Sequence, residues 1–248
     1  MKLVKFFEFK ETDLDPIKSF RLKDELNPKL WDNFDINKEV RENLLKIAQD
    51  FYNSTELNAE IKDVVLTGSL ANYNWSEKYS DYDLHILIDF RDINDDIVLV
   101  KKYVDSAKSV WNELHDIKIL GYEVEVYIQD INEPHKSTGI FSLLKDKWNV
   151  RPEKAEVEPD EEMIAEKAKG AMMAIDDLEE QIDEDKYEQF NEKLKKVWDK
   201  IKNYRKSGLE SEGGEFSTGN FVFKLLRRNG YITKIMSLKR EAYDKQFK

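Results

Sequence analysis

Apolar residues recur at helical spacing in two segments of the N-terminal half. A single stripe in residues 37 to 53 predicts a helix, and Asn37 is a suitable residue to cap its start. Residues 95 to 115 repeat the pattern and predict a second helix. The first stripe comprises Val40, Leu44, Leu45, Ile47, Ala48, Phe51 and Tyr52, and the second Ile97, Val100, Tyr103, Val104, Ala107, Val110, Trp111 and Leu114.

Short apolar runs that predict strands lie between and after these helices. Residues 64 to 66 form one such run, and a second begins at Asp81 and continues to Ile88. Residues 117 to 129 predict two short strands that are broken at Gly121. Helices and strands together predict an α/β core.

The second half of the chain has a different pattern. Two prolines and a run of Glu and Lys near residues 149 to 160 predict a linker. Two helices with clear apolar stripes are expected beyond it, followed by a polar, glycine-bearing loop over residues 208 to 219 and one or two shorter helices. We therefore expect an N-terminal extension (1–36), a core (37–150) and a helical domain (160–248).

Composition indicates a globular chain with a very polar surface. Of the 248 residues, 40% are apolar and 37% are charged, so a core can form under a charged surface. No apolar run approaches the roughly 20 residues that a membrane span needs, so no membrane partner is expected. The chain has no cysteine and a charged N-terminus, which favour a cytoplasmic location.

The net charge of −11 argues against broad, nonspecific binding to nucleic acids. The charge is unevenly distributed, however. Residues 156 to 188 are strongly acidic, whereas residues 224 to 248 contain eight Lys or Arg against Glu241 and Asp244. This basic segment could steer a triphosphate or an RNA end, although solvated helix faces would give the same pattern.

Asp81 and Asp83 carry the most specific chemical signal. Residues two apart on a strand point to the same face, so both carboxylates should be directed toward one point. Two neighbouring anions repel each other unless a cation lies between them. Oxygen ligands at this density suit a hard divalent ion such as Mg²⁺, which keeps positions for substrate phosphates.

A Gly68-Ser69 turn precedes these aspartates. Glycine allows a tight turn and a close approach to a ligand, and Ser69 adds a hydroxyl group where residues 70 to 74 could begin a short helix. Exposed N–H groups at a helix start attract phosphate. The order strand, turn, short helix and strand therefore favours a site for a metal and a nucleotide.

Gly68-Ser69, eleven intervening residues and then Asp81-Tyr82-Asp83-Leu84 resemble the signature of the DNA polymerase β-like nucleotidyltransferase superfamily. The resemblance implies an α+β fold with a small mixed sheet and flanking helices, here followed by the helical domain. It also implies two Mg²⁺ or Mn²⁺ ions and transfer of a nucleoside monophosphate from a nucleoside triphosphate to a hydroxyl acceptor. An RNA end, a protein or a small molecule could be that acceptor.

The resemblance also implies a third carboxylate on a later strand. In residues 122 to 128, Glu123 and Glu125 alternate with apolar residues and share one face. Glu125 fits the family pattern better because it lies inside the apolar run, as Val-Glu-Val. The sequence leaves Glu123 open as the alternative.

Four further residues are weaker candidates for the site. Lys78 lies in the loop before Asp81, and His85 continues the face of the two aspartates. Arg227 and Arg228 are expected on the terminal helices, where an arginine fork would match phosphate oxygens. For each of them, surface charge or packing is the competing interpretation.

A broader resemblance extends over residues 26 to 245, to nucleotidyltransferase-like proteins of tailed bacteriophages. Residues 26–32, 133–139 and 214–217 carry it. It implies the cytoplasm of a bacterial host as the location. It also leaves two other classes of function open, a nucleotide-binding regulator without turnover and a phage protein that acts by interaction with the host.

Overall fold

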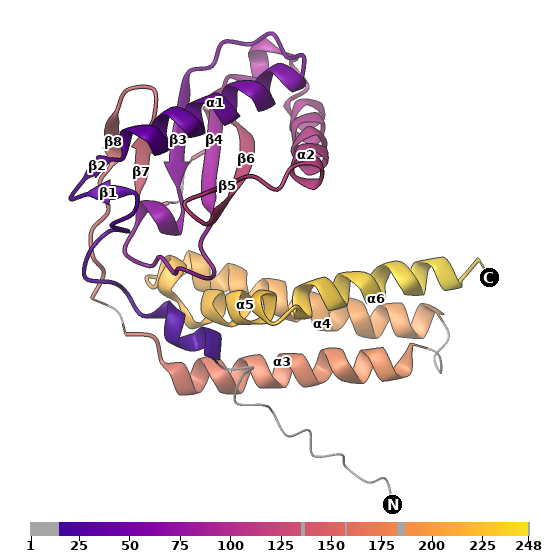
Figure 1. Ribbon diagram of the computed structural model, residues 1–248. Helices are drawn as coiled ribbons and strands as arrows, with labels where there is room; N and C mark the ends of the chain where they lie inside the picture. Colours follow the sequence, from indigo (N-terminus) through magenta and orange to yellow (C-terminus); the bar gives the residue numbers. More distant parts are fainter. Residues whose placement is uncertain (1–14, 135–136, 157, 183–186, 248) are drawn as a thin grey trace, which may run out of the picture. The chain divides into compact units, whose positions relative to one another are not determined.

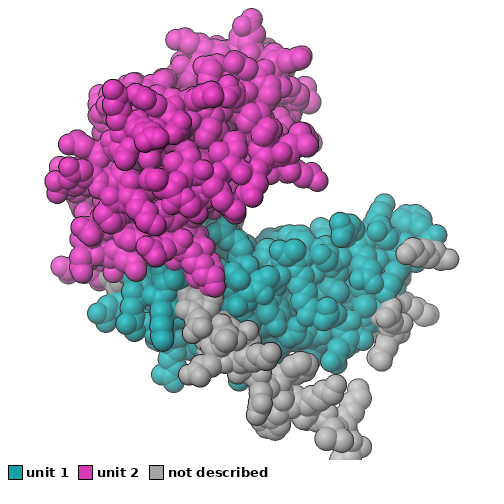
Figure 2. Space-filling view, viewed as in Figure 1, with its two compact units in different colours: residues 1–21, 157–248 teal, residues 22–156 magenta. Residues whose placement is uncertain are grey.

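The computed structural model describes residues 15–134, 137–156, 158–182 and 187–247. The chain divides into two compact units, which Figure 2 distinguishes by colour. Residues 22–156 form one unit, called here the sheet unit, and residues 1–21 with 157–248 form the other, called the helical unit. Residues 22–36, which we expected in an N-terminal extension, therefore belong to the sheet unit.

The sheet unit is built on six strands in the order β5-β6-β4-β3-β7-β8. They are β3 (Asp63–Thr67), β4 (Tyr82–Ile88), β5 (Lys118–Ile119), β6 (Tyr122–Asp130), β7 (Ile140–Ser142) and β8 (Lys147–Val150). Strands β4 and β6 pair in parallel and the other neighbours pair antiparallel, so the sheet is mixed. A separate two-stranded ribbon joins β1 (Trp31–Asp32) and β2 (Asp35–Ile36).

Two helices cover one face of this sheet (Figure 1). Helix α1 (Lys38–Ser54) begins at Asn37, whose side chain accepts hydrogen bonds from two backbone N–H groups, as predicted. Helix α2 (Ile97–Leu114) buries Val100 and Val104 in the same core. Tyr82 and Leu84 of β4 pack into this core, so the residues that alternate with them lie on the opposite face.

The apolar stripe expected along α2 is only partly buried. Tyr103, Val110 and Leu114 expose 47%, 57% and 73% of their surface in the sheet unit. The helix contacts β6 near the edge of the sheet, where less apolar surface is available to cover it.

The short helix expected over residues 70 to 74 is also shorter than predicted. A single 3₁₀ turn, η3 (Ser69–Ala71), follows Gly68, and Asn72 is already extended, with φ −151° and ψ 179°. Asn72 is buried, and its side-chain oxygen accepts a hydrogen bond from the Tyr73 N–H group. This local bond replaces the next helical turn.

The helical unit has its own hydrophobic core. Its long helices bury most of the predicted stripes, for example through Met172 and Ile175 on one and Leu194 on the other, although Tyr204 of the second stripe is exposed. Its elements are η2 (Asp15–Phe20), α3 (Glu161–Gln181), α4 (Tyr187–Glu210), η5 (Gly214–Phe216), α5 (Thr218–Arg228) and α6 (Tyr231–Lys245). The loop expected over residues 208 to 219 is therefore shorter, because α4 continues through Gly208 and α5 begins at Thr218.

The structure is thus mixed, with a mixed sheet and, in its described parts, six α-helices, which is compatible with the expected α+β class. Across these described parts, the helices are all too short or too polar to span a bilayer.

Candidate metal centre

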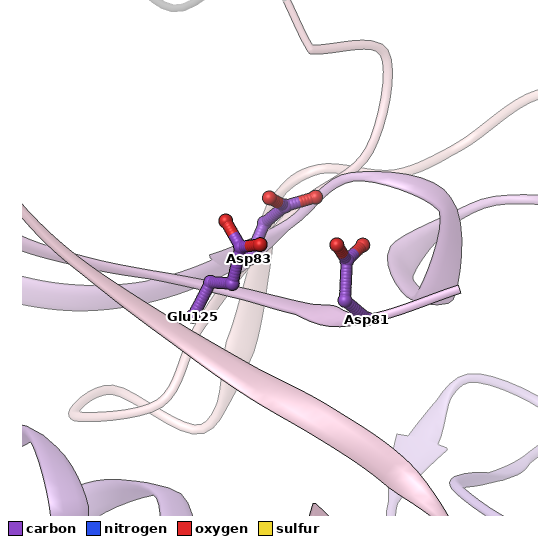
Figure 3. A group of neighbouring side chains, drawn as sticks. All are labelled: Asp81, Asp83 and Glu125. Atoms are coloured by element: carbon purple, nitrogen blue, oxygen red, sulfur yellow. The ribbon is translucent and has the colours of Figure 1, made fainter. Parts of the chain in front are cut away.

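The strand pairing brings the predicted carboxylates together. Asp83 on β4 lies directly opposite Glu125 on the parallel strand β6, and opposite Thr67, the last residue of β3. Asp81 immediately precedes β4 and is two residues before Asp83, so its side chain emerges on the same face. Figure 3 shows the three carboxylates converging from two adjacent strands.

These three side chains form a compact set of oxygen donors. Asp81, Asp83 and Glu125 each offer a carboxylate oxygen, and the three oxygens lie within 4.8 Å of one another. All three residues are partly buried, which weakens solvent screening of their mutual repulsion. A divalent cation would relieve that repulsion, and a donor set of oxygen atoms alone suits Mg²⁺ or Mn²⁺. The arrangement could therefore hold a metal.

Gly68 makes room for the Asp83 carboxylate. A Cβ atom at this position would lie only 1.8 Å from Asp83 Oδ2. The backbone has φ 74° and ψ −159°, a conformation that only glycine adopts readily. Gly68 is thus required for two reasons. A side chain at this position would displace the Asp83 carboxylate, and it would also strain the backbone.

Ser69 closes the loop that leads to Asp81. Its hydroxyl group is 2.7 Å from the Ser80 hydroxyl, and the Ser80 hydroxyl also accepts a hydrogen bond of 2.8 Å from the Ser76 N–H group. The backbone N–H of Ser80 donates to the Ser76 carbonyl oxygen as well. These bonds fix the residue before Asp81 against the turn that begins at Gly68.

Tyr127 holds the Glu125 carboxylate in place. Its phenol hydroxyl donates a hydrogen bond to Glu125 Oε2. Burial, this hydrogen bond and the charge of the nearby Asp83 raise the pKa of Tyr127 well above the ordinary tyrosine value, so the phenol remains a donor at neutral pH. The Lys108 ammonium group lies 3.7 Å from the centre of the Tyr127 ring.

The other predicted residues of the sheet unit occupy different environments. Glu123 is exposed and forms an ion pair of 3.3 Å with Lys118, so it lies outside the carboxylate cluster. The His85 ring stacks on that of Tyr127 with the centroids 4.7 Å apart. Lys78 is exposed, and its ammonium group lies 5.1 Å from the ring of Tyr79.

Arg227 and Arg228 belong to the helical unit. Arg227 is exposed at the end of α5, while the Arg228 guanidinium donates a hydrogen bond to Ser19 Oγ and stacks on Phe20. Arg228 therefore has partners within the helical unit, whereas Arg227 lies on its surface.

Two contributors to the site, Tyr127 and Ser80, were not among the predicted residues. Tyr127 has a detectable signal in the sequence, because it alternates with Glu125 on the same strand face. Ser80 has none, since its role depends on a contact with Ser69 eleven residues away.

A comparison of the chain with protein-family models, with curated proteins and with solved structures found no significant match. The geometry of the site is therefore the basis on which a function is proposed.

Proposed function

We propose that this chain is a metal-dependent nucleotidyltransferase. It would transfer a nucleoside monophosphate from a nucleoside triphosphate to a hydroxyl acceptor, with release of pyrophosphate. The observation that carries this proposal is the convergence of Asp81, Asp83 and Glu125 within 4.8 Å, beside the Gly68 turn. Carboxylates on adjacent strands next to a glycine turn suit both divalent ions and a phosphate-bearing substrate.

Each side chain has a distinct role in this proposal. Asp81 and Asp83 would hold two Mg²⁺ or Mn²⁺ ions, and Glu125 would hold the ion that activates the acceptor hydroxyl. Bound there, the two ions would stabilise charge on the attacking and leaving oxygens. The Gly68 backbone and the Ser69 hydroxyl position the pyrophosphate group as it leaves, so catalysis is mostly positioning and charge neutralisation.

Asp81→Asn/Asp83→Asn is the variant that tests the proposal. Pyrophosphate release is measured from each of the four ribonucleoside triphosphates with Mg²⁺ or Mn²⁺, with and without RNA and protein extract from a bacterial host. We expect release by the wild-type chain and its loss in the variant. The matched control is Asp95→Asn/Asp105→Asn, which removes two exposed carboxylates from the same unit.

The outcomes discriminate among classes of function. Release that survives in the Asp81→Asn/Asp83→Asn variant would refute the assignment of the site. Metal-dependent nucleotide binding without release would indicate a binding module instead. Where release occurs, the experiment is repeated with labelled triphosphates. The fraction of the extract that becomes labelled then identifies the acceptor as an RNA end, a protein or a small molecule.

A further inference from the structure

Helices α3, α4 and α5 border a cavity of about 660 Å³ within the helical unit. Its walls come from residues 166–174 of α3, 196–204 of α4 and 219–223 of α5, three helices that pack against one another (Figure 1). Cavities of roughly 300–1,000 Å³ hold small organic ligands. The cavity therefore has the size of a small-molecule site, and it belongs to a different unit from the carboxylates.

The interior of this cavity is apolar. Ile201 and Val222 are buried, and Ala171, Val197 and Phe223 are half-buried. None of these five side chains has a hydrogen-bonding group, so a polar group placed against them would lose its bonds to water without replacement. The part of a ligand that enters the cavity must therefore be apolar.

The rim of the cavity is polar and mostly cationic. Lys167 lies on α3, Lys196 and Lys200 lie on α4, and all three are exposed. Among the described residues that line the cavity, Glu166 is the one acid against these three lysines. Lys196 and Lys200 are one helical turn apart, a spacing at which like charges repel each other. An anion bound at the rim would relieve this repulsion.

Gly170 keeps the cavity open on the side of α3. It lies in the interior of this helix, where glycine is less favourable than alanine. A Cβ atom at Gly170 would have nothing within 4 Å, so packing within the chain does not require a glycine there. Gly219 of the same lining differs, because its Cβ atom would lie 2.4 Å from the Tyr204 carbonyl oxygen. Close packing explains Gly219, whereas Gly170 leaves space that a ligand can occupy.

We propose that this cavity binds a single-chain amphiphile with an anionic head, namely a free fatty acid. The acyl chain lies against the apolar interior, and the carboxylate lies among the three lysines of the rim. A nucleotide fits less well, because the donors and acceptors of its base would find no partners in the interior. The site is independent of nucleotidyl transfer, so it stands or fails separately from the function proposed above.

The test measures binding of octanoate, decanoate and dodecanoate to the full chain by calorimetry. The fatty acids are kept below the concentrations at which they form micelles, and EDTA prevents a metal from linking them to the carboxylates of the sheet unit. Each CH₂ group that the cavity buries should tighten binding about threefold to fourfold. Decyltrimethylammonium, a cation with the same chain as decanol, should bind at least about tenfold more weakly than decanoate.

Gly170→Leu tests the cavity itself. The added side chain fills space that no atom of the chain occupies, so decanoate should bind at least about tenfold more weakly. The free energy of unfolding should be unchanged or higher, because leucine is the better helix former. The control Ser237→Leu adds the same side chain at an exposed position of α6 and should bind decanoate like the wild type.

Lys196→Gln/Lys200→Gln tests the rim. Two exposed charges near the carboxylate are lost, so decanoate should bind about threefold to tenfold more weakly. The control Lys195→Gln/Lys239→Gln removes the same charge from exposed positions outside the lining and should have little effect.

Three results would overturn the proposal. One is decanoate binding that is absent or does not strengthen with chain length. Another is equal binding by Gly170→Leu and its control, or by the two double lysine variants. The third is association of the chain with phosphatidylglycerol vesicles in place of free decanoate, which would indicate a membrane surface as the ligand.

Discussion

The backbone at Gly68 passes so close to the Asp83 carboxylate that no side chain fits between them. We predict that Gly68→Ala weakens Mn²⁺ binding by at least about tenfold, since Asp83 must move, and destabilises the fold by about 1–3 kcal/mol through backbone strain. Paramagnetic titration and thermal unfolding measure the two effects. Gly230→Ala is the matched control, because its φ of 77° is equally unusual but nothing lies within 4 Å of the added Cβ. A similar loss of Mn²⁺ affinity in both variants would contradict the steric explanation.

Tyr127 and Glu125 are joined by the phenol hydroxyl. We predict that Tyr127→Phe weakens Mn²⁺ binding by about 10-fold, because groups that orient a ligand carboxylate typically contribute this much. The control is Tyr103→Phe, which removes a hydrogen bond of 2.6 Å to the Thr55 carbonyl oxygen in the same unit. Each variant should lose about 1 kcal/mol of stability. Unchanged Mn²⁺ affinity in Tyr127→Phe would show that Glu125 needs no such support.

The loop before β4 depends on its serines. Ser80→Ala removes the contacts to the Ser69 hydroxyl and the Ser76 N–H group, so we expect faster hydrogen exchange in residues 72 to 80. Mn²⁺ affinity should fall about three- to tenfold, since roughly 1 kcal/mol of loop order is lost. Ser109→Ala, which removes a hydroxyl contact within α2, should change neither quantity. Exchange rates equal to those of the wild type would exclude the serine contacts as the restraint.

Elements with a strong local pattern could be predicted from the sequence. Helix α1 with its Asn37 cap and the strand that begins near Asp81 follow from side-chain spacing within one segment. Asp81 and Asp83 could be paired for the same reason, because two residues on one strand share a face. Local periodicity predicted these elements, whereas the short helix expected over residues 70 to 74 is only a single 3₁₀ turn.

The remaining features depend on contacts between segments distant in sequence. Strands β7 and β8 have only three and four residues and are stabilised by pairing, β7 with the buried strand β3 and β8 with β7, so their own sequence carried no prediction. The family resemblance favoured Glu125 over Glu123 but left both open, and the register with Asp83, which periodicity does not give, places Glu125 in the cluster. Glu123 instead forms an ion pair with Lys118 across the β5–β6 hairpin, outside the carboxylate cluster.

The two units have separate hydrophobic cores. Ile175 of α3 and Leu66 of β3 are both fully buried, the first in the helical unit and the second two residues before Gly68. Truncation of either to alanine should cost about 2–5 kcal/mol of unfolding free energy through lost burial and a cavity. These two substitutions are therefore a matched pair that disturbs one core at a time.

Their effects on the metal centre should differ. We predict that Leu66→Ala weakens Mn²⁺ binding, because β3 leads directly to the turn that supports Asp83, whereas Ile175→Ala leaves Mn²⁺ affinity unchanged under conditions where both variants are folded. Denaturant unfolding and Mn²⁺ titration on the same samples provide both values. Equal losses of affinity would mean that the helical unit supports the carboxylates energetically, and that the metal centre is a property of the whole chain rather than of the sheet unit.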